Sequence, residues 1–367
     1  MEIIVIGTRG FPNVQGGVEN HCQNLYSRLV DLGCDVTVFA RKAYVGYKPY
    51  DYFGVRIIPL FSIKNKYLES LIHSFWAVIF SRHFKSDIIH FHGIGPGVCI
   101  PFAKLLGFRV VLTTHGENYK HSSWGPIAKF CLRCCEYISV TFADKVISVS
   151  QHSADNLVAK YGKTSHVIPN GMNFKYSEIS CNNLIKYNLK QGQYFVFVGR
   201  LVREKGVHDL ITAYLSLKYT DWRLVIIGDA DHKTKYYDEI KEKARKSQGI
   251  ILMGRMTGNA LLEVFSNAGL FVLPSYYECA PIALLEAMSF GLNCLISDIA
   301  ATREIPFPEI NYFKPGDVNL LAVKLMEFSQ YNMSNQEKSN QRDYVMKYHN
   351  WSSIAIRTLE VYKGIEM

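Results

Sequence analysis

The sequence has no hydrophobic run long enough to cross a bilayer. Its longest apolar stretch, 68–84, is interrupted by His73 and Arg82, whereas a spanning helix needs about 20 apolar residues. The segment after Met1, Glu2–Ile6, has neither a basic start nor a small-residue cleavage site. We therefore expect a buried strand there, no secretory signal, and a cytoplasmic protein.

The sequence also lacks the paired cysteines and histidines of a structural zinc site. Its nine cysteines are an odd number, and without an export signal a disulfide framework is not expected. Cys131, Cys134 and Cys135 form a C-x-x-C-C cluster, but no second pair lies at zinc spacing. We predict that these three cysteines are small apolar residues buried on a helix.

Basic residues exceed acidic ones, yet no basic block is present. The formal net charge is +9, which favours a phosphate-bearing substrate, an anionic membrane surface or nucleic acid as partner. The cations are scattered and no aromatic RNP-like motif accompanies them, so we expect no nucleic acid. A non-catalytic protein that binds a sugar or a nucleotide stays an alternative.

The sequence does have the material for two packed domains: 367 residues, of which 48% are hydrophobic and 20% charged. Apolar runs alternate with amphipathic stretches in both halves, which predicts α/β domains with parallel sheets covered on both faces. The expected helices of the first half are 17–32, 68–83, 97–106 and 124–142. The expected strands are 3–6, 35–39, 88–91, 110–114 and 145–149, then 194–198, 223–227, 250–253, 270–273 and 293–296.

A polar, irregular segment, 172–193, separates the two halves. We predict an N-terminal domain over residues 1–172 and a C-terminal domain over residues 173–340. The remainder, 341–367, is a helical stretch broken near Asn350, and we expect it to pack back towards the N-terminal domain. Two parallel sheets in tandem leave one natural ligand site, the crevice between the carboxyl ends of their strands.

A glycine and two cations follow the first strand of the second half, in the segment 199–206, G-R-L-V-R-E-K-G. Gly199 lets a ligand approach the backbone, and Gly206 opens the next helix. Arg200 and Lys205 at the carboxyl edge of a parallel sheet suit a diphosphate. Taken alone, the segment is better explained as a solvated basic loop.

A second segment, 278–286, reads E-C-A-P-I-A-L-L-E and follows the expected strand 270–273. Pro281 suits the first position of a helix and Gly291 suits its end. Free N–H groups at such a helix start bind phosphate. Glu278 is placed to accept hydrogen bonds from sugar hydroxyls, and Glu286 to hold both hydroxyls of a ribose. Two solvent-facing glutamates on an amphipathic helix are the simpler alternative.

These segments carry a family resemblance. E-C-A-P-I-A-L-L-E-A-M-S-F-G and F-V-G-R-L-V-R-E-K-G resemble the donor-site signatures of retaining family-4 glycosyltransferases, and Pro-Asn-Gly-Met at 169–172 and the closing Asn-Trp-Ser-Ser-Ile-Ala helix are similar to that family too. The similarity covers nearly the whole chain. It implies the α/β GT-B fold, with two Rossmann-like parallel-sheet domains facing across a cleft, and neither a cofactor nor a metal.

The resemblance also implies roles for residues. Arg200 and Lys205 would neutralise the leaving diphosphate, Glu286 would bind the ribose and Glu278 the transferred sugar. The implied catalytic residues are His115, Arg200, Lys205 and Glu278. The implied nucleotide-sugar-binding residues are Gly16, Gly17, Gly199, Arg200, Lys205, Arg255, Met256, Glu278, Ala280, Pro281, Ile282 and Glu286.

In the first half, Gly16 and Gly17 resemble the family's flexible loop for the donor phosphate and the acceptor. A dinucleotide-binding site is not expected, because no G-x-G-x-x-G is present and the second strand ends at Arg41, where NAD binding needs an acid. His115 follows the strand 110–114 and matches the family's active-site histidine. For His90 and His92, packing is a simpler explanation than contact with an acceptor.

Asp229 and Asp231 form a D-x-D, which in other proteins binds a metal. Here the pair follows a strand as Gly-Asp, which resembles the family's ordinary turn. The N-terminal G-T-R-G segment is similar to a bacterial subset often described as rhamnosyltransferases.

The implied reaction is transfer, with retention of configuration, from a UDP-hexose, a UDP-N-acetylhexosamine or dTDP-rhamnose. The implied acceptor is a lipid-linked oligosaccharide of O-antigen or capsule synthesis. A GT-B nucleotide-sugar epimerase is the alternative, although no acid and base for both faces of a sugar ring stand out.

The stretch 68–84 gives an indication of where in the cell the protein is located. Lys64, Lys66, Arg82 and Lys85 flank its aromatic and aliphatic residues, a pattern that suits a helix resting on an anionic membrane. A core helix of the first domain explains most of these residues equally well. With the resemblance, we expect a peripheral protein at the inner face of the plasma membrane.

Overall fold

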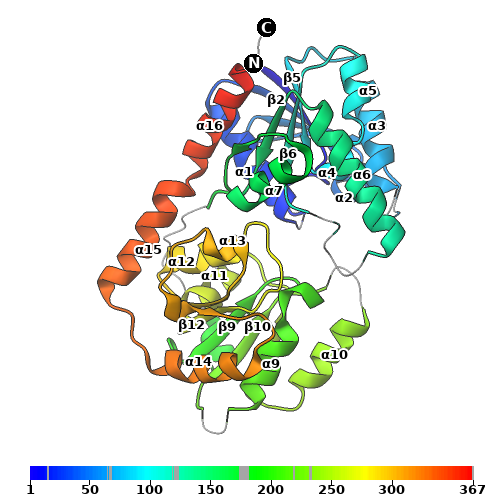
Figure 1. Cartoon of the computed structure of the whole chain (residues 1–367). Helices are drawn as coiled ribbons and strands as arrows, with labels where there is room; N and C mark the ends of the chain where they lie inside the picture. The colour runs from blue at the N-terminus through cyan, green and yellow to red at the C-terminus, as the bar shows by residue number, and fades with distance from the viewer. Residues whose placement is uncertain are drawn as a thin grey trace. The chain divides into compact units, whose positions relative to one another are not determined.

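The chain divides into two compact units (Figure 1). The N-terminal unit comprises Met1–Gly171 and His349–Met367, and the C-terminal unit is Met172–Tyr348. The structure, a computed structural model, describes residues 1–14, 16–63, 65, 68–117, 119, 124–172, 182–217, 220–230 and 234–365.

The N-terminal unit is built on a sheet with the strand order β3-β4-β2-β1-β5-β6-β7-β8, in which only β3 and β4 pair antiparallel. Every residue of β5 and β6 is buried, as a sheet covered on both faces requires. The strands are β1 (Glu2–Ile6), β2 (Asp35–Arg41), β3 (Tyr50–Tyr52), β4 (Val55–Leu60), β5 (Ile88–His92), β6 (Val110–Thr114), β7 (Lys145–Ser148) and β8 (His166–Val167).

Helices cover both faces of this sheet. Ile3 and Val5 pack against α1 and α16, whereas Ile4 and Ile6 pack against the opposite layer, which includes α3, α5, α6 and α7. This alternation follows from the two-residue period of a strand. The helices are α1 (Gly17–Asp31), α2 (Lys42–Val45), α3 (Glu69–Ser81), α4 (Ile94–Gly97), α5 (Ile100–Leu105), α6 (Pro126–Phe142), α7 (Gln151–Tyr161) and α16 (Trp351–Lys363).

The C-terminal unit has an all-parallel sheet with the order β11-β10-β9-β12-β13-β14. Its strands are β9 (Tyr194–Val198), β10 (Arg223–Ile227), β11 (Ile250–Gly254), β12 (Leu270–Leu273), β13 (Asn293–Ser297) and β14 (Tyr312–Phe313). Its helices are α8 (Asn182–Lys186), α9 (Val207–Leu215), α10 (Lys235–Ala244), α11 (Gly258–Ser266), α12 (Ile282–Phe290), α13 (Ala300–Arg303), α14 (Val318–Gln330) and α15 (Asn335–Tyr348), with 3-10 turns η2 (Arg203–Lys205) and η3 (Glu309–Asn311).

The C-terminal stretch differs from the sequence-based expectation. Residues 341–348 belong to α15 of the C-terminal unit, not to the closing helix. Val345 is buried in the core that also holds residues of α11 and α12, and Arg342 donates a hydrogen bond to the carbonyl of Phe290. The break near Asn350 is confirmed: its side chain caps α16 by accepting from the N–H groups of Ser352 and Ser353.

Helix α6 is oriented differently from the prediction. Cys131 and Cys134 are exposed, not buried. The buried side of α6 carries Glu136, whose carboxylate accepts hydrogen bonds from Tyr119 and Tyr161. This polar cluster shares the inner face of α6 with Val140, which is buried in the core, whereas Cys131, Cys134, Ile127 and Phe130 face outwards. No described helix is long and apolar enough to span a bilayer.

Candidate functional site

Each sheet has one point where the strand order reverses. In the N-terminal unit it lies between β1 and β5, and in the C-terminal unit between β9 and β12. Connections leave in opposite directions at such a point, so the carboxyl ends of the two strands open a crevice in which α/β proteins bind ligands. Both points coincide with the segments that the sequence singles out.

In the C-terminal unit, Lys205 and Glu278 meet at this point. Nζ of Lys205 lies 2.5 Å from Oε1 of Glu278, and Ser275 Oγ donates to the same oxygen at 2.7 Å. Glu278 is buried and Lys205 is partly exposed. The two residues were predicted to act on different parts of a donor, and the structure makes them an ion pair.

Close backbone packing fixes this geometry. Gly206 has a left-handed backbone (φ 65°), and a Cβ there would lie 1.9 Å from the carbonyl oxygen of Pro274. The amide of Tyr276 also donates to the carbonyl of Glu204 at 2.8 Å. Only glycine lets the segment after β9 approach the segment after β12 so closely, and this approach brings Lys205 to Glu278.

The helix start beside Glu278 has free donors. Helix α12 begins at Ile282 with Pro281 as its N-cap, one residue later than predicted, and Gly291 ends it in the left-handed conformation, as predicted. The first amides of a helix have no partner within it, so the N–H groups of Ile282 and Ala283 are available to an anion. Ala280, also in the predicted set, lies in the turn just before.

Glu286 lies on the second turn of α12. Burial raises the pKa of its carboxyl to about 7. Among the described residues, no hydrogen bond joins this carboxylate to Lys205 or Glu278. An acid whose pKa is strongly raised by burial is typical of a functional site.

The other predicted residues of this unit lie along the same edge. Gly199 and Arg200 directly follow β9, and the Arg200 side chain is exposed. Arg255 and Met256 follow β11, two strands from β9, or about 10 Å at the usual strand spacing. Asp229 accepts a hydrogen bond from the amide of Ala230, while Asp231 lies outside the described residues.

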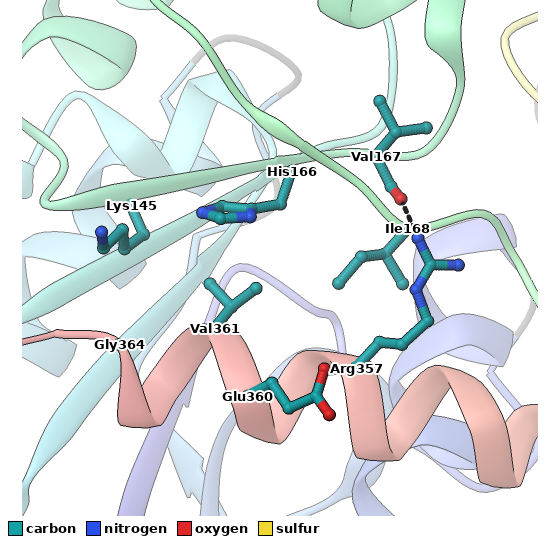
Figure 2. Close-up of a pocket in the computed structure, with 8 residues that line it drawn as sticks. All are labelled: Lys145, His166, Val167, Ile168, Arg357, Glu360, Val361 and Gly364. Atoms are coloured by element: carbon teal, nitrogen blue, oxygen red, sulfur yellow. Dashed lines mark hydrogen bonds between the residues drawn. The ribbon is translucent and has the colours of Figure 1, made fainter.

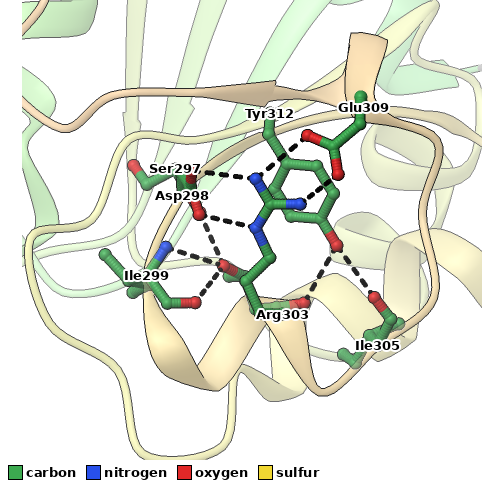
Figure 3. A network of polar contacts seen from close by, with 8 residues as sticks. Ser297, Asp298, Ile299, Arg303, Ile305, Glu309 and Tyr312 are labelled. Atoms are coloured by element: carbon green, nitrogen blue, oxygen red, sulfur yellow. Dashed lines mark hydrogen bonds and ion pairs between the residues drawn. The ribbon is translucent and has the colours of Figure 1, made fainter.

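A network of polar contacts follows β13 at the same edge (Figure 3). Arg303 pairs with Asp298 through Nε and Nη2, at 2.6 and 2.8 Å, and also with Glu309, while its guanidinium lies over the ring of Tyr312. Two carboxylates share Arg303, so this cluster has a net negative charge, which does not favour a diphosphate, whereas Lys205 pairs with one carboxylate.

In the N-terminal unit the corresponding edge carries histidines. Nδ1 of His92, at the end of β5, lies 2.9 Å from Nε2 of His115, which follows β6. His21 of α1 packs edge-on against His115 with ring centroids 4.9 Å apart. His90 is buried and bonds Tyr362 through Nδ1. Desolvation by burial lowers the pKa of His90, His92 and His115 well below the usual value.

The predicted glycine pair is at the start of α1. Gly16 is the N-cap and Gly17 the first helical residue. Glu19, two residues on, accepts a hydrogen bond from the amide of Arg9 at 3.0 Å, which ties the loop after β1 to the helix start. Gln15 lies outside the described residues.

Sequence reasoning missed two site residues. His21 joins the histidine cluster from α1, and Ser275 bonds Glu278. The only available signals were the place of His21 one turn after the glycine pair and the place of Ser275 just after a strand.

A surface pocket of the N-terminal unit lies elsewhere (Figure 2). It is formed beside the edge strand β8 and the last turns of α16, where Arg357 donates to the carbonyl of Val167. Lys145, at the start of β7, also lines it. His92 and His115 instead lie at the carboxyl ends of β5 and β6, and neither lines this pocket, so the pocket is separate from the candidate site.

Comparison with known families agrees with the geometry. Residues 15–176 match the family Glycosyltransferase Family 4, and residues 183–344 match Glycosyl transferases group 1. The chain therefore carries a glycosyltransferase family 4 domain followed by a group 1 domain. It is a glycosyltransferase.

Relatives of this glycosyltransferase extend over almost its whole length. An uncharacterized glycosyltransferase of Methanocaldococcus jannaschii is 24% identical, over 99% of this chain and 98% of the relative. The alpha-maltose-1-phosphate synthase of Mycobacterium tuberculosis is 25% identical, over 96% of this chain and 97% of the synthase. The epimerase alternative gains no support from these relatives.

Solved structures share the fold of the glycosyltransferase. Sucrose-phosphate synthase from Thermosynechococcus elongatus superposes with a TM-score of 0.81 at 21% identity, covering 99% of this chain and 98% of that one. Anabaena HepE in complex with UDP and glucose gives 0.79 at 18% identity, with 99% of each chain covered. The predicted α/β GT-B fold class with two parallel-sheet domains is confirmed.

Proposed function

We propose that this glycosyltransferase binds a nucleotide diphosphate sugar at the carboxyl edge of its C-terminal sheet. The observation that carries the proposal is the Lys205–Glu278 ion pair at the point where the strand order reverses, beside the free amides of α12. A diphosphate competes with Glu278 for the ammonium of Lys205, and Arg200 adds a second cation. Once freed, the carboxylate of Glu278 accepts hydrogen bonds from sugar hydroxyls.

The proposed donor is a UDP-hexose, a UDP-N-acetylhexosamine or dTDP-rhamnose. Anabaena HepE, which shares the fold, has UDP and glucose bound, which supports a donor of this class. Glu286 holds the ribose hydroxyls, and the backbone near Arg255 and Met256 contacts the base. Neither requires a metal.

The proposed reaction retains the anomeric configuration. The bond between the sugar's anomeric carbon and the phosphate oxygen breaks, and an acceptor hydroxyl forms a new bond on the same face. The hydroxyl proton goes to the departing diphosphate. Lys205, Arg200 and the amides of α12 stabilise the charge that develops on this leaving group. His115, whose pKa is lowered by burial, acts in its neutral form.

A donor screen tests this function. Purified protein is incubated with each nucleotide sugar and a saccharide acceptor, and release of nucleoside diphosphate is measured together with the anomeric configuration of the product. We expect release that depends on the acceptor and a product with the donor's configuration. Conversion of the donor without an acceptor, or an inverted product, would contradict the proposal.

We further propose that the acceptor is a lipid-linked oligosaccharide of O-antigen or capsule synthesis, reached at the inner face of the plasma membrane. Support comes from an apolar surface on α3, α5 and α6. Ile127 is 81% exposed, Leu105 84% and Trp76 50%. Phe75 of α3 stacks on Phe102 of α5, with ring centroids 5.1 Å apart, which makes the surface continuous between these two helices.

Exposed apolar area of this extent marks a binding surface, and exposed cations accompany it: Arg82 and Lys85 beyond α3, and Arg133 on α6. Aromatic residues bordered by cations suit an anionic bilayer. Lys64 and Lys66, which the sequence also assigns to this border, lie outside the described residues.

Vesicle sedimentation tests the surface. We expect binding to vesicles that contain phosphatidylglycerol, little binding to phosphatidylcholine alone, and release at high salt. Replacing Trp76 and Ile127 together with serine should reduce binding, as should reversing the charge of Lys85 with Lys64 and Lys66, while turnover of a soluble acceptor analogue stays unchanged. Unchanged vesicle binding by both variants would rule this surface out.

A further inference from the structure

Three imidazoles of the N-terminal unit converge on one point. His21 comes from α1, His92 from the end of β5 and His115 from the turn after β6. One ring nitrogen from each lies within 4.8 Å of the other two. The three rings are thus arranged as a potential set of metal ligands, drawn from segments up to 94 residues apart.

One of these nitrogens has no partner. Nδ1 of His21 lies 2.9 Å from Oδ1 of Asn170, and because that oxygen only accepts, Nδ1 donates and Nε2 keeps the lone pair. Nε2 is buried and has no hydrogen-bond partner among the residues that the structure describes, and His21 is only 3% exposed. A buried polar atom left unsatisfied is uncommon in folded proteins, and this nitrogen is free to bind a ligand.

The surroundings suit a neutral ligand set. Burial lowers the pKa of His21 to about 4 and the pKa values of His92 and His115 well below the usual range. All three rings are therefore uncharged near pH 7, and each offers a lone pair without first losing a proton.

Outer contacts orient two of the rings, as they do in known metal sites. Asn170 fixes the ring of His21, and the hydroxyl of Tyr26 bonds Nε2 of His92. Tetrahedral Zn–N bonds of about 2.0–2.1 Å place ligand nitrogens about 3.3 Å apart. The widest separation here is about 1.5 Å more than that, which rotation of the rings about the broad χ2 torsion of histidine can close.

We propose that His21, His92 and His115 bind one divalent transition metal ion of the Zn²⁺ or Co²⁺ type, with an open fourth position. Imidazole ligands select such ions over Mg²⁺ or Ca²⁺. When the ion binds, the hydrogen bond between His92 and His115 is lost. The ring that donated this bond then carries its proton on its second nitrogen, away from the ion. His115 is partly exposed and gives the ion access from solvent.

The consequence for activity rests on the proposed function. An ion held by His115 takes up the imidazole lone pair that the proposed role of this histidine uses, so it inhibits turnover, and catalysis does not require it. Metal binding itself is independent of that function and is measured without any sugar donor.

The test is a titration of the purified, metal-free full chain with Co²⁺, followed by visible absorption and equilibrium dialysis. We expect one ion per chain, an intense tetrahedral-type spectrum and a higher unfolding temperature. His21→Gln and His92→Gln should each weaken binding at least about tenfold, and Asn170→Ala, which removes the orienting partner, by about 10–100-fold.

His90→Gln is the matched control. His90 is a buried histidine on the same strand as His92, but both its nitrogens are occupied, Nδ1 by the hydroxyls of Tyr26 and Tyr362 and Nε2 by Thr113 Oγ1. It should bind Co²⁺ within about twofold of the parent. An octahedral-type spectrum, no rise in the parent's unfolding temperature, or equal binding by His21→Gln would each overturn the proposal. Neither the spectrum nor the temperature shift depends on a variant that folds.

Discussion

The two units present chemically opposite edges on the same kind of scaffold. Both are parallel sheets with one reversal of strand order. At that point the C-terminal unit has Lys205 paired with Glu278, with Arg200 and the start of α12 nearby. The N-terminal unit has His92 and His115, which burial keeps neutral.

The difference in charge favours different roles for the two edges. Charged groups bind a diphosphate strongly and respond to the charge that moves when it leaves. Neutral imidazoles bind uncharged hydroxyl groups, or a divalent transition metal ion such as Zn²⁺ or Co²⁺, without attracting a polyanion. The fold supplies the place for both, and the residues at each strand end decide the chemistry.

The largest effect is expected when Lys205 is removed from the charged edge, which is the carboxyl edge of the C-terminal sheet. Lys205→Ala should lower turnover by about 10²–10³-fold, equivalent to about 2–4 kcal/mol in the transition state, because the leaving diphosphate loses its cation and Glu278 its partner. The measurement is steady-state kinetics. Lys243→Ala, which removes a cation paired with Glu239 on α10, is the control and should act like the parent. Kinetics of Lys205→Ala within twofold of the parent would remove Lys205 from the donor site.

The second test compares two helix-capping glycines. Gly206 and Gly162 share a left-handed backbone, but a Cβ at Gly206 meets Pro274 while one at Gly162 meets nothing within 4 Å. Gly162→Ala should cost about 1–2 kcal/mol for the backbone alone. Gly206→Ala should cost about 2 kcal/mol more because of the contact. Chemical denaturation measures both, and equal costs would show that the approach of the two loops is not tight.

The third test concerns Glu286, because burying its charged carboxylate lowers the stability of the folded state. The folded pKa of Glu286 is raised from 4.5 to about 7, so the folded state holds more protons between these values and stability falls as pH rises through that window. Glu286→Gln should therefore raise the free energy of unfolding by about 1–3 kcal/mol at pH 8, and by almost nothing at pH 4.

The same variant should lose turnover, since glutamine cannot accept from both ribose hydroxyls as a carboxylate does. Thermal unfolding at the two pH values gives the stability difference, and Glu242→Gln on the exposed side of α10 is the control. An equal change at pH 4 and pH 8 would mean that the raised pKa is not the cause.

The smallest expected effect is that of chelation. If the cations of the C-terminal unit alone serve the diphosphate, excess EDTA leaves the rate unchanged, or raises it when the preparation carries metal on the histidine cluster. Loss of activity that Mg²⁺ or Mn²⁺ restores would contradict this and would return attention to Asp229 and Asp231.

Much of the fold was predictable because buried parallel strands are continuous apolar runs. Strands such as β5, β6 and β9 appear close to their expected limits. The short edge strands β3 and β14 have weaker patterns and were missed, and so was β4, an internal strand that contains Pro59. Which unit buries Val345 is a matter of tertiary packing, so the helical pattern of 341–364 gave no sign that α15 and α16 belong to different units.

For the site, the sequence motifs located the residues that follow each strand. They did not reveal the order of the strands in the sheet, which decides which of these residues meet. The pairing of Lys205 with Glu278 spans 73 residues and depends on β9 lying beside β12. His21 joins His92 and His115 only because α1 packs next to β5 and β6. Nothing local to α1 distinguishes His21 from an ordinary core residue, and its role depends on the topology.

Calorimetric titration of UDP and dTDP tests the division between the two edges most directly. Whichever nucleotide binds the parent more tightly should bind Lys205→Ala at least about tenfold more weakly and Lys243→Ala equally well, and the corresponding nucleoside should bind far more weakly than the diphosphate. If Lys205→Ala bound the diphosphate as tightly as the parent does, the charged edge of the C-terminal unit would not be the donor site.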